Sequence, residues 1–174
     1  MTLIRPAELA DAAALARCHL AAWRDSYRPR CTDEILSRPT IEDEYTAKWS
    51  AKLQRPKEIV LLADGGAEGL VGFIEGGRER AARDDYQGEI YAVYVLPDYR
   101  RQGVGRKLFR RFAQALREQN IGSAIVWVFA DNPCRHCYAA WGAEPVETKP
   151  ITVAGQNLTQ AAYAWRNLGS VAQV

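Results

Sequence analysis

Apolar and polar positions along the chain follow two different periods. Apolar runs of strand length, several of them alternating, occur at residues 2–5, 57–63, 69–75, 89–95, 123–129, 144–153 and 158–168. Helical spacing occurs at 8–23, 41–53 and 104–119, with a further helical stretch at 32–36 ahead of Pro39. Asn132 followed by Pro133 is typical of a helix N-cap and first turn, so a short helix is expected there.

This order of elements, βααβββαβαββ, predicts an α/β protein with a mixed sheet and helices on both faces. The polar segment 76–87, which reads GGRERAARDDYQ, is expected to form an exposed loop. At 174 residues the chain fits a single domain, residues 1–174, with a sizeable core.

One segment, Glu89–Gly105, joins a strand, a turn and a helix that opens with glycines. The first backbone N–H groups of a helix lack intrahelical acceptors and lie at the positive end of the helix dipole, so they can hold a phosphate group. Gly103 and Gly105 have no Cβ to obstruct a ligand, and basic side chains surround the turn. The sequence therefore predicts a site for an anionic ligand.

Two other glycine-rich phosphate motifs do not fit this segment. A Walker P-loop ends in Gly-Lys-Ser or Gly-Lys-Thr, which this chain lacks. A dinucleotide fingerprint requires a third glycine where the chain has Leu108. The remaining alternative is a tight connection whose arginines form a solvated face.

The segment Arg100–Gly105, reading RRQGVG, resembles the phosphate-binding signature of the GNAT acetyltransferase superfamily: Gln or Arg, two residues, Gly, one residue, then Gly or Ala. Asn132 and the run Tyr138–Gly142 are similar to a later motif of that family, with one residue fewer between Asn and Tyr. The order of elements is also similar across nearly the whole chain.

The resemblance implies a mostly antiparallel mixed sheet, splayed at the coenzyme site, and transfer of an acetyl group from acetyl-CoA to an amine. The coenzyme's pyrophosphate would lie on the turn, and its pantetheine arm would pair with the central strand. The residues implied to bind the coenzyme are Val93, Tyr94, Val95, Arg100, Arg101, Gln102, Gly103, Val104, Gly105, Arg106, Lys107 and Asn132. Glu89 is implied as the general base and Tyr138 as the acid for the departing thiolate.

Each of these polar residues also has a structural interpretation. Glu89 could be a strand-end carboxylate paired with an arginine, and Tyr138 a core tyrosine beside Trp141. Asn132 could be a plain helix cap. His19 falls inside a helical pattern and is interpreted as a packed or surface residue.

Composition limits the partners and the compartment. A net charge of +2 gives no global basis for nucleic-acid binding, and no apolar run approaches the ~20 residues that span a bilayer. The N-terminus lacks the pattern of a signal peptide, so a cytoplasmic protein is expected. The four cysteines are expected to be reduced, and no metal is expected, because Cys134 and Cys137 have no second ligand pair at zinc-site spacing.

The acceptor is open on sequence grounds. An acidic cluster within Asp33–Glu44 would favour a cationic amine on a small molecule or protein, or else form a solvated face. Since the family often dimerises, a homodimer is one expectation. Two other functions remain as alternatives: a non-catalytic acyl-CoA-binding or sensing module, and a nucleic-acid-binding module that uses the basic run Arg100–Arg117.

Overall fold

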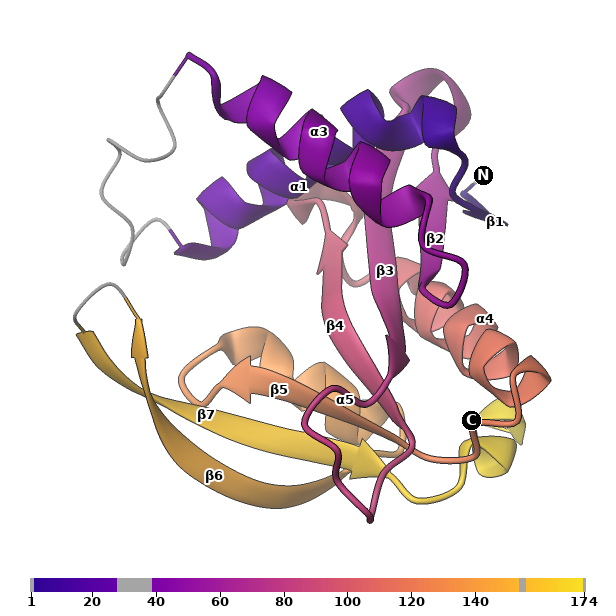
Figure 1. The fold of residues 1–174 in the computed structure, drawn as a ribbon, viewed down its shortest axis with the longest axis vertical. Helices are drawn as coiled ribbons and strands as arrows, with labels where there is room; N and C mark the ends of the chain where they lie inside the picture. Colours follow the sequence, from indigo (N-terminus) through magenta and orange to yellow (C-terminus); the bar gives the residue numbers. More distant parts are fainter. Residues whose placement is uncertain (1, 28–38, 154–155, 174) are drawn as a thin grey trace. The chain divides into compact units, whose positions relative to one another are not determined.

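The computed structural model describes residues 2–27, 39–153 and 156–173, and Figure 1 shows the path of the chain. The strands are β1 (Leu3–Pro6), β2 (Ile59–Asp64), β3 (Leu70–Arg78), β4 (Gly88–Val95), β5 (Ala124–Phe129), β6 (Glu144–Val153) and β7 (Gln156–Trp165). The α-helices are α1 (Ala12–Tyr27), α3 (Ile41–Leu53), α4 (Val104–Glu118) and α5 (His136–Ala140). The helical stretch expected at 32–36 lies outside the described residues.

The seven strands hydrogen-bond in the order β1-β2-β3-β4-β5-β7-β6. The β1/β2, β5/β7 and β6/β7 pairs are antiparallel, whereas β4 and β5 are parallel. This mixed sheet confirms the fold class expected from the pattern. In the described residues, the parallel ladder joins Gly88–Ile90 to Ala124–Val126 and so covers only the first part of β4.

Backbone contacts divide the chain into two compact units. The first comprises Met1–Glu75 and Ala92–Phe112. Within it α1 and α3 lie side by side (Figure 1), and they bury a core with β2 and β3. The core follows the sequence pattern: α1 contributes one apolar stripe, and the continuous apolar run of β2 is buried along almost its whole length. The largest members of this cluster are Leu15, Trp49, Leu62 and Phe73.

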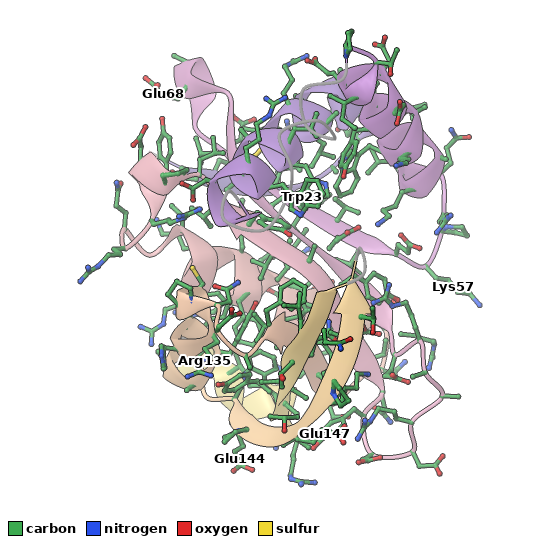
Figure 2. All side chains as sticks on the ribbon, turned by 90° about the vertical axis from the view of Figure 1, so that its left-hand side faces the viewer. Trp23, Lys57, Glu68, Arg135, Glu144 and Glu147 are labelled. Atoms are coloured by element: carbon green, nitrogen blue, oxygen red, sulfur yellow. The ribbon has the colours of Figure 1, made fainter. Side chains whose placement is uncertain are left out.

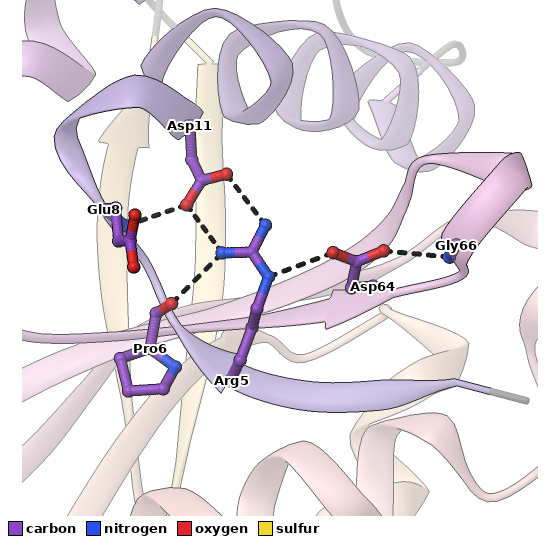
Figure 3. A network of polar contacts seen from close by, with 6 residues as sticks. All are labelled: Arg5, Pro6, Glu8, Asp11, Asp64 and Gly66. Atoms are coloured by element: carbon purple, nitrogen blue, oxygen red, sulfur yellow. Dashed lines mark hydrogen bonds and ion pairs between the residues drawn. The ribbon is translucent and has the colours of Figure 1, made fainter.

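A polar network fixes the start of the chain against β2 (Figure 3). The Arg5 guanidinium donates two 2.8 Å hydrogen bonds to the Asp11 carboxylate and one of 3.0 Å to Asp64. The pKa of Asp11 lies below its ordinary value because of the hydrogen bonds from Arg5. The backbone N–H of Gly66 and then the Arg5 guanidinium lower the pKa of Asp64 in the same way. One arginine thereby joins β1, the first helical turn and the end of β2.

His19 on α1 packs within an aromatic cluster. Its ring centroid lies between 5.1 and 5.7 Å from those of Tyr45, Trp49, Phe73 and Tyr94. Burial, with a smaller contribution from Lys52 and Lys48, lowers the pKa of His19 to about 4. The imidazole is therefore neutral at pH 7, which agrees with its interpretation as a packed residue.

The second unit comprises Gly76–Tyr91 and Ala113–Val174. Its β6 and β7 form a long antiparallel hairpin, with a bulge between Pro145 and Glu147, and β7 also pairs with β5 (Figure 1). Ile125, Ala162 and Ala164 form its apolar cluster together with Tyr86.

The expectation that residues 76–87 form an exposed loop is wrong in two places. Gly76 and Gly77 continue β3 and are buried. Strand pairing satisfies their backbone groups, and neither residue has an apolar side chain from which its burial could be predicted. Tyr86 is buried against β5 and β7, although the surrounding sequence is strongly polar. Arg83 forms an ion pair with Glu147 of β6, which Figure 2 labels, so the segment is fastened to the hairpin.

The described ranges contain four α-helices, α1, α3, α4 and α5. None of these helices combines the length and the apolar character that crossing a bilayer requires.

Candidate active site

The turn between β4 and α4 has an unusual backbone. Pro97–Tyr99 forms a single 3₁₀ turn, closed by the Arg100 N–H donating to Pro97 O at 3.1 Å. Arg101 and Gly103 then adopt left-handed conformations, with φ of 60° and 80°. Such a conformation is costly for a residue with a Cβ, so Arg101 holds local strain that the surrounding turn must offset.

Gly103 is the residue from which α4 starts. Lys107 N donates to Gly103 O at 3.0 Å, which is the first helical hydrogen bond. A Cβ built on Gly103 would meet no atom within 4 Å, so the space beside it is open and only its positive φ requires glycine. The N–H groups of Val104 and Gly105 belong to the first turn and have no intrahelical acceptor. Open space, a helix N-terminus and nearby basic side chains are the features that an anionic group needs.

Arg100 differs from the other basic residues of this turn. Its Nε donates to Val95 O at 2.9 Å, and its Nη2 lies 2.7 Å from Asp25 of α1. The guanidinium therefore ties the end of β4 to the end of α1. Arg101, Arg106 and Lys107 are exposed around the turn. The exposed Gln102 donates to Asp98 O at 2.7 Å, which closes the turn from within.

Val93–Val95 are the last three residues of β4, and all three are half-buried. The Tyr94 side chain packs into the aromatic cluster, with its ring centroid 5.6 Å from that of Phe73. Gly72 of β3 lies directly beside this segment: a Cβ there would stand 2.7 Å from Tyr94 O and 3.2 Å from Val95 Cα. The two strands approach so closely only because residue 72 has no side chain.

Glu89 lies on β4 in the second unit, and its carboxylate is buried. Arg80 donates to it from Nε at 3.0 Å and from Nη2 at 2.6 Å, and the Arg80 backbone N–H adds a third hydrogen bond of 3.2 Å. The arginine pairing that the sequence left open is therefore present. It does not remove Glu89 from consideration as a base, because the arginine is itself largely exposed.

Tyr138 lies on α5 within a second aromatic cluster. Its ring centroid is 5.7 Å from that of Trp141, 5.8 Å from that of Tyr163 and 6.3 Å from that of Trp165. Trp165 Nε1 donates to Trp141 O at 2.9 Å, which fixes the turn that follows α5. Packing beside Trp141 is thus present, and the chemical role of Tyr138 stays a prediction.

Asn132 caps the turn that leads into α5. Its side-chain oxygen accepts the Cys134 N–H at 2.8 Å. Arg135, labelled in Figure 2, donates to Ala130 O and closes the same loop from the other side. The structural interpretation of Asn132 therefore holds, and binding of the coenzyme stays a prediction.

The candidate residues fall into two sets. Val93–Val95 and Arg100–Lys107 belong to the first unit, where the turn brings them together. Glu89, Asn132 and Tyr138 belong to the second unit. Sequence reasoning missed Arg80 and Asp25, because a partner nine residues away across a loop, or on a distant helix, leaves no periodic signal.

Acidic residues occupy the first turn of α3. Glu42 forms an ion pair with Arg17 at 3.2 Å, and Glu44 accepts a hydrogen bond from Thr40 at 2.9 Å. Acidic side chains at a helix N-terminus are favourable for the helix itself. The remainder of the acidic cluster, Asp33 and Glu34, lies outside the described residues.

The cysteines differ in their predicted reactivity. Cys134 and Cys137 are exposed, whereas Cys18 is buried and burial raises its pKa to about 12. Although the Cys137 residue as a whole is exposed, partial desolvation of its thiol raises the pKa of that group. Because the thiolate is the reactive species, iodoacetamide should modify Cys134 before Cys137 and leave Cys18 unmodified in the folded protein. Peptide mass spectrometry over a time course tests this, with urea-unfolded protein as the control in which Cys18 reacts. Equal rates at Cys18 and Cys134 in the folded protein would contradict the burial.

Comparisons with known proteins agree with this geometry. The chain is 30% identical over 171 residues to the uncharacterized N-acetyltransferase YuaI of Bacillus subtilis (strain 168), covering 98% of this chain and 96% of that protein. The fold of this chain is similar to that of YncA from Salmonella typhimurium, whose structure was solved with its cofactor acetyl-CoA. The TM-score is 0.71, with 22% identity over 97% of this chain and 94% of that one. The ribosomal-protein-alanine N-acetyltransferase of Brucella melitensis gives a TM-score of 0.72 and 24% identity over 94% of this chain and 98% of that one.

The resemblance carried by the Arg100–Gly105 signature is confirmed at the level of the family. Residues 20–143, which include the whole turn and the candidate residues on β4 and α5, match the acetyltransferase (GNAT) family. The chain therefore belongs to the acetyltransferase (GNAT) family.

Proposed function

We propose that this acetyltransferase moves an acetyl group from acetyl-CoA to a primary amine on a small molecule or a protein. The observation that carries the proposal is the turn at Gly103, where open space adjoins the first N–H groups of α4 and exposed basic side chains. The coenzyme's pyrophosphate lies on the backbone of Gln102–Arg106. Arg101, Arg106 and Lys107 supply charge there, while Arg100 holds the end of β4 in place.

The pantetheine arm pairs with the backbone of Val93–Val95. Support comes from the parallel ladder between the described residues of β4 and β5, which extends along β4 only as far as Ile90. The same backbone N–H groups stabilise the oxyanion that forms on the thioester carbon, a donor effect typically worth ~3 kcal/mol. Asn132 contributes a hydrogen bond to the arm.

In the reaction the amine nitrogen attacks the thioester carbon, the C–S bond breaks and the nitrogen loses a proton. A free glutamate of pKa ~4.3 cannot readily remove a proton from an alkylammonium of pKa ~10.4, since the transfer is uphill by about 8 kcal/mol. Glu89 therefore takes the proton through water or after attack, when the nitrogen is far more acidic.

The departing thiolate is the second group that needs a proton partner. Tyr138 is proposed to hydrogen-bond the sulfur, because full transfer from a phenol of pKa ~10 to a thiolate of pKa ~8.5 is unfavourable by about 2 kcal/mol. Stabilisation of the leaving group by a hydrogen bond lowers the barrier without that cost.

The first test is coenzyme turnover, followed as free-thiol release across a panel of amines and lysine peptides. We expect turnover with one amine class, and Tyr138→Phe to slow it by about tenfold to a hundredfold, as expected for loss of a proton donor to the leaving group. Tyr163→Phe is the matched control, because it removes a hydroxyl from a neighbouring ring of the same cluster. Equal rates for the two variants would remove Tyr138 from the reaction. Coenzyme binding without thiol release on any amine would favour a sensing module.

The remaining expectations are part of the same proposal. A cationic acceptor is favoured by the acidic first turn of α3, although Arg17 already pairs with Glu42. Homodimerisation is proposed on the family resemblance alone, and cytoplasmic location stays an expectation from the sequence pattern.

A further inference from the structure

Two side chains on one face of β4, those of Glu89 and Tyr91, together contact a cation. Glu89 and Tyr91 are two residues apart in the strand, so their side chains point to the same side of the sheet. A carboxylate beside an aromatic face combines a charge partner with a ring that attracts cations. The function proposed above uses Glu89 only as a base and gives Tyr91 no role.

In the free protein this cation is the Arg80 guanidinium. Its two nitrogens meet the two Glu89 oxygens in a fork, at 3.0 and 2.6 Å, while its guanidinium carbon lies 4.0 Å from the Tyr91 ring centroid. The same cation thus makes a bidentate charged hydrogen bond and a stacking contact. The Glu89 carboxylate and the Tyr91 ring therefore both suit a compact organic cation.

Glu89 and Tyr91 are held in place by contacts that do not involve the Arg80 side chain. Glu89 is in register with Ile125 of β5, and the Tyr91 hydroxyl donates to Arg78 O at 2.6 Å. The loop is also fixed: the Glu79 carboxylate accepts N–H groups from Ala81 and Arg83, each at 2.9 Å. Moving the Arg80 side chain therefore requires no opening of the loop.

The exposure of the two partners is very unequal. The Glu89 side chain is 7% exposed, whereas that of Arg80 is 60% exposed. A buried carboxylate requires a cation, because an unpaired buried charge is costly. The exposed arginine, by contrast, regains its hydration when it swings into solvent. Another cation can therefore replace Arg80 at Glu89, whereas leaving the Glu89 carboxylate without any cation is costly.

We propose that Glu89 and Tyr91 form a binding site for a primary ammonium or guanidinium group, which Arg80 occupies in the free protein and which the acceptor enters by displacing the Arg80 side chain. This assignment rests on the proposed amine acetylation, and it makes a cationic acceptor a requirement of the site. A neutral molecule cannot release the Arg80 side chain without leaving Glu89 unpaired.

The binding test uses methylguanidinium and ethylammonium chloride with the full chain and no coenzyme, followed by amide chemical shifts in NMR titrations. Arg80→Ala should bind methylguanidinium about tenfold or more tighter than wild type, because the Glu89 carboxylate no longer pairs with the Arg80 side chain and can form the same bidentate contact with the probe. Arg80→Ala combined with Glu89→Gln should lose this gain. Arg80→Lys keeps a positive charge but loses the fork, so its affinity for the probe should lie between those of wild type and Arg80→Ala. Equal binding by wild type and Arg80→Ala, or a gain that survives Glu89→Gln, would overturn the proposal.

Two further measurements keep the result interpretable. Arg80→Gln repeats the titration with a neutral side chain of similar reach, in case the alanine variant is unstable in circular dichroism. In turnover assays Arg80→Ala should lower KM for cationic amines by about tenfold relative to weakly basic amines, in line with the gain in binding. An unchanged ratio would overturn entry of the acceptor at this site. Because the titration needs no catalysis, failure of the cation site and failure of the proposed acetylation give different results.

Discussion

Gly105→Trp is expected to abolish coenzyme binding and acetyl transfer together. Gly105 is the second residue of α4 and follows the left-handed Gly103 by two positions, and the space beside Gly103 is open. An indole placed there covers the N–H groups proposed to hold the pyrophosphate, while the helix itself accepts tryptophan more readily than glycine. We expect coenzyme affinity to fall by about a hundredfold or more, equal to at least ~2.7 kcal/mol. Isothermal titration with acetyl-CoA and thiol release measure the two losses.

The control for this variant is Gln114→Trp, an indole at an exposed position further along the same helix. The substitution removes a 2.9 Å hydrogen bond from Gln114 to Glu118, but it should leave coenzyme affinity unchanged. If folded Gly105→Trp protein retains wild-type affinity for acetyl-CoA, the pyrophosphate does not lie on this turn. Equal losses in both variants would point to a general effect of the helix rather than to the turn.

Leu15→Ala is expected to cost about 2–5 kcal/mol of unfolding free energy. Leu15 is 0% exposed on α1 and packs in the cluster with Trp49 and Phe73, so its truncation leaves a cavity in the first unit. For a chain of this length, the cost corresponds to a fall in Tm of about 5–15 °C. Thermal and urea unfolding, followed by circular dichroism, measure it.

Leu9→Ala is the matched control, since it makes the same chemical change six positions earlier in the chain. Leu9 is 55% exposed, so its truncation should change stability by less than about 0.5 kcal/mol. Similar losses for the two variants would show that the buried stripe of α1 does not carry the stability assigned to it.

The local features of this protein could be predicted from its sequence. The strand, turn and helix around Arg100–Gly105 are contiguous, and residue type encodes most of their conformations: proline ends the strand and Gly103 permits a positive φ. The positive φ of Arg101 is the exception, because an arginine gives no sign of it. The apolar stripe of α4 was predicted in the same way, and Val104, Leu108, Phe112 and Leu116 are indeed buried. Helix and strand periods are short-range properties, so a single sequence reveals them.

Contacts between segments distant in the sequence could not be predicted in this way. Tyr86 lies in a polar stretch and is nevertheless buried, because β5 and β7 supply the apolar surface that covers it. Arg100 carries the family signature, yet its guanidinium is held by Asp25 from a different helix. In each case the partner comes from another element, and no local pattern identifies it.

The sequence by itself determined the family, the order of elements and the residues of the turn that we propose to bind phosphate, because each depends on neighbouring residues and their spacing. Only the tertiary structure decided which charges are paired. It placed Arg80 on Glu89 and Tyr91, and it showed that Gly72 permits the close approach of β3 to Tyr94 and Val95. The physical reason is that ion pairs and close backbone approaches depend on distances through space, which are fixed only when the strands have paired and the loops have closed over them.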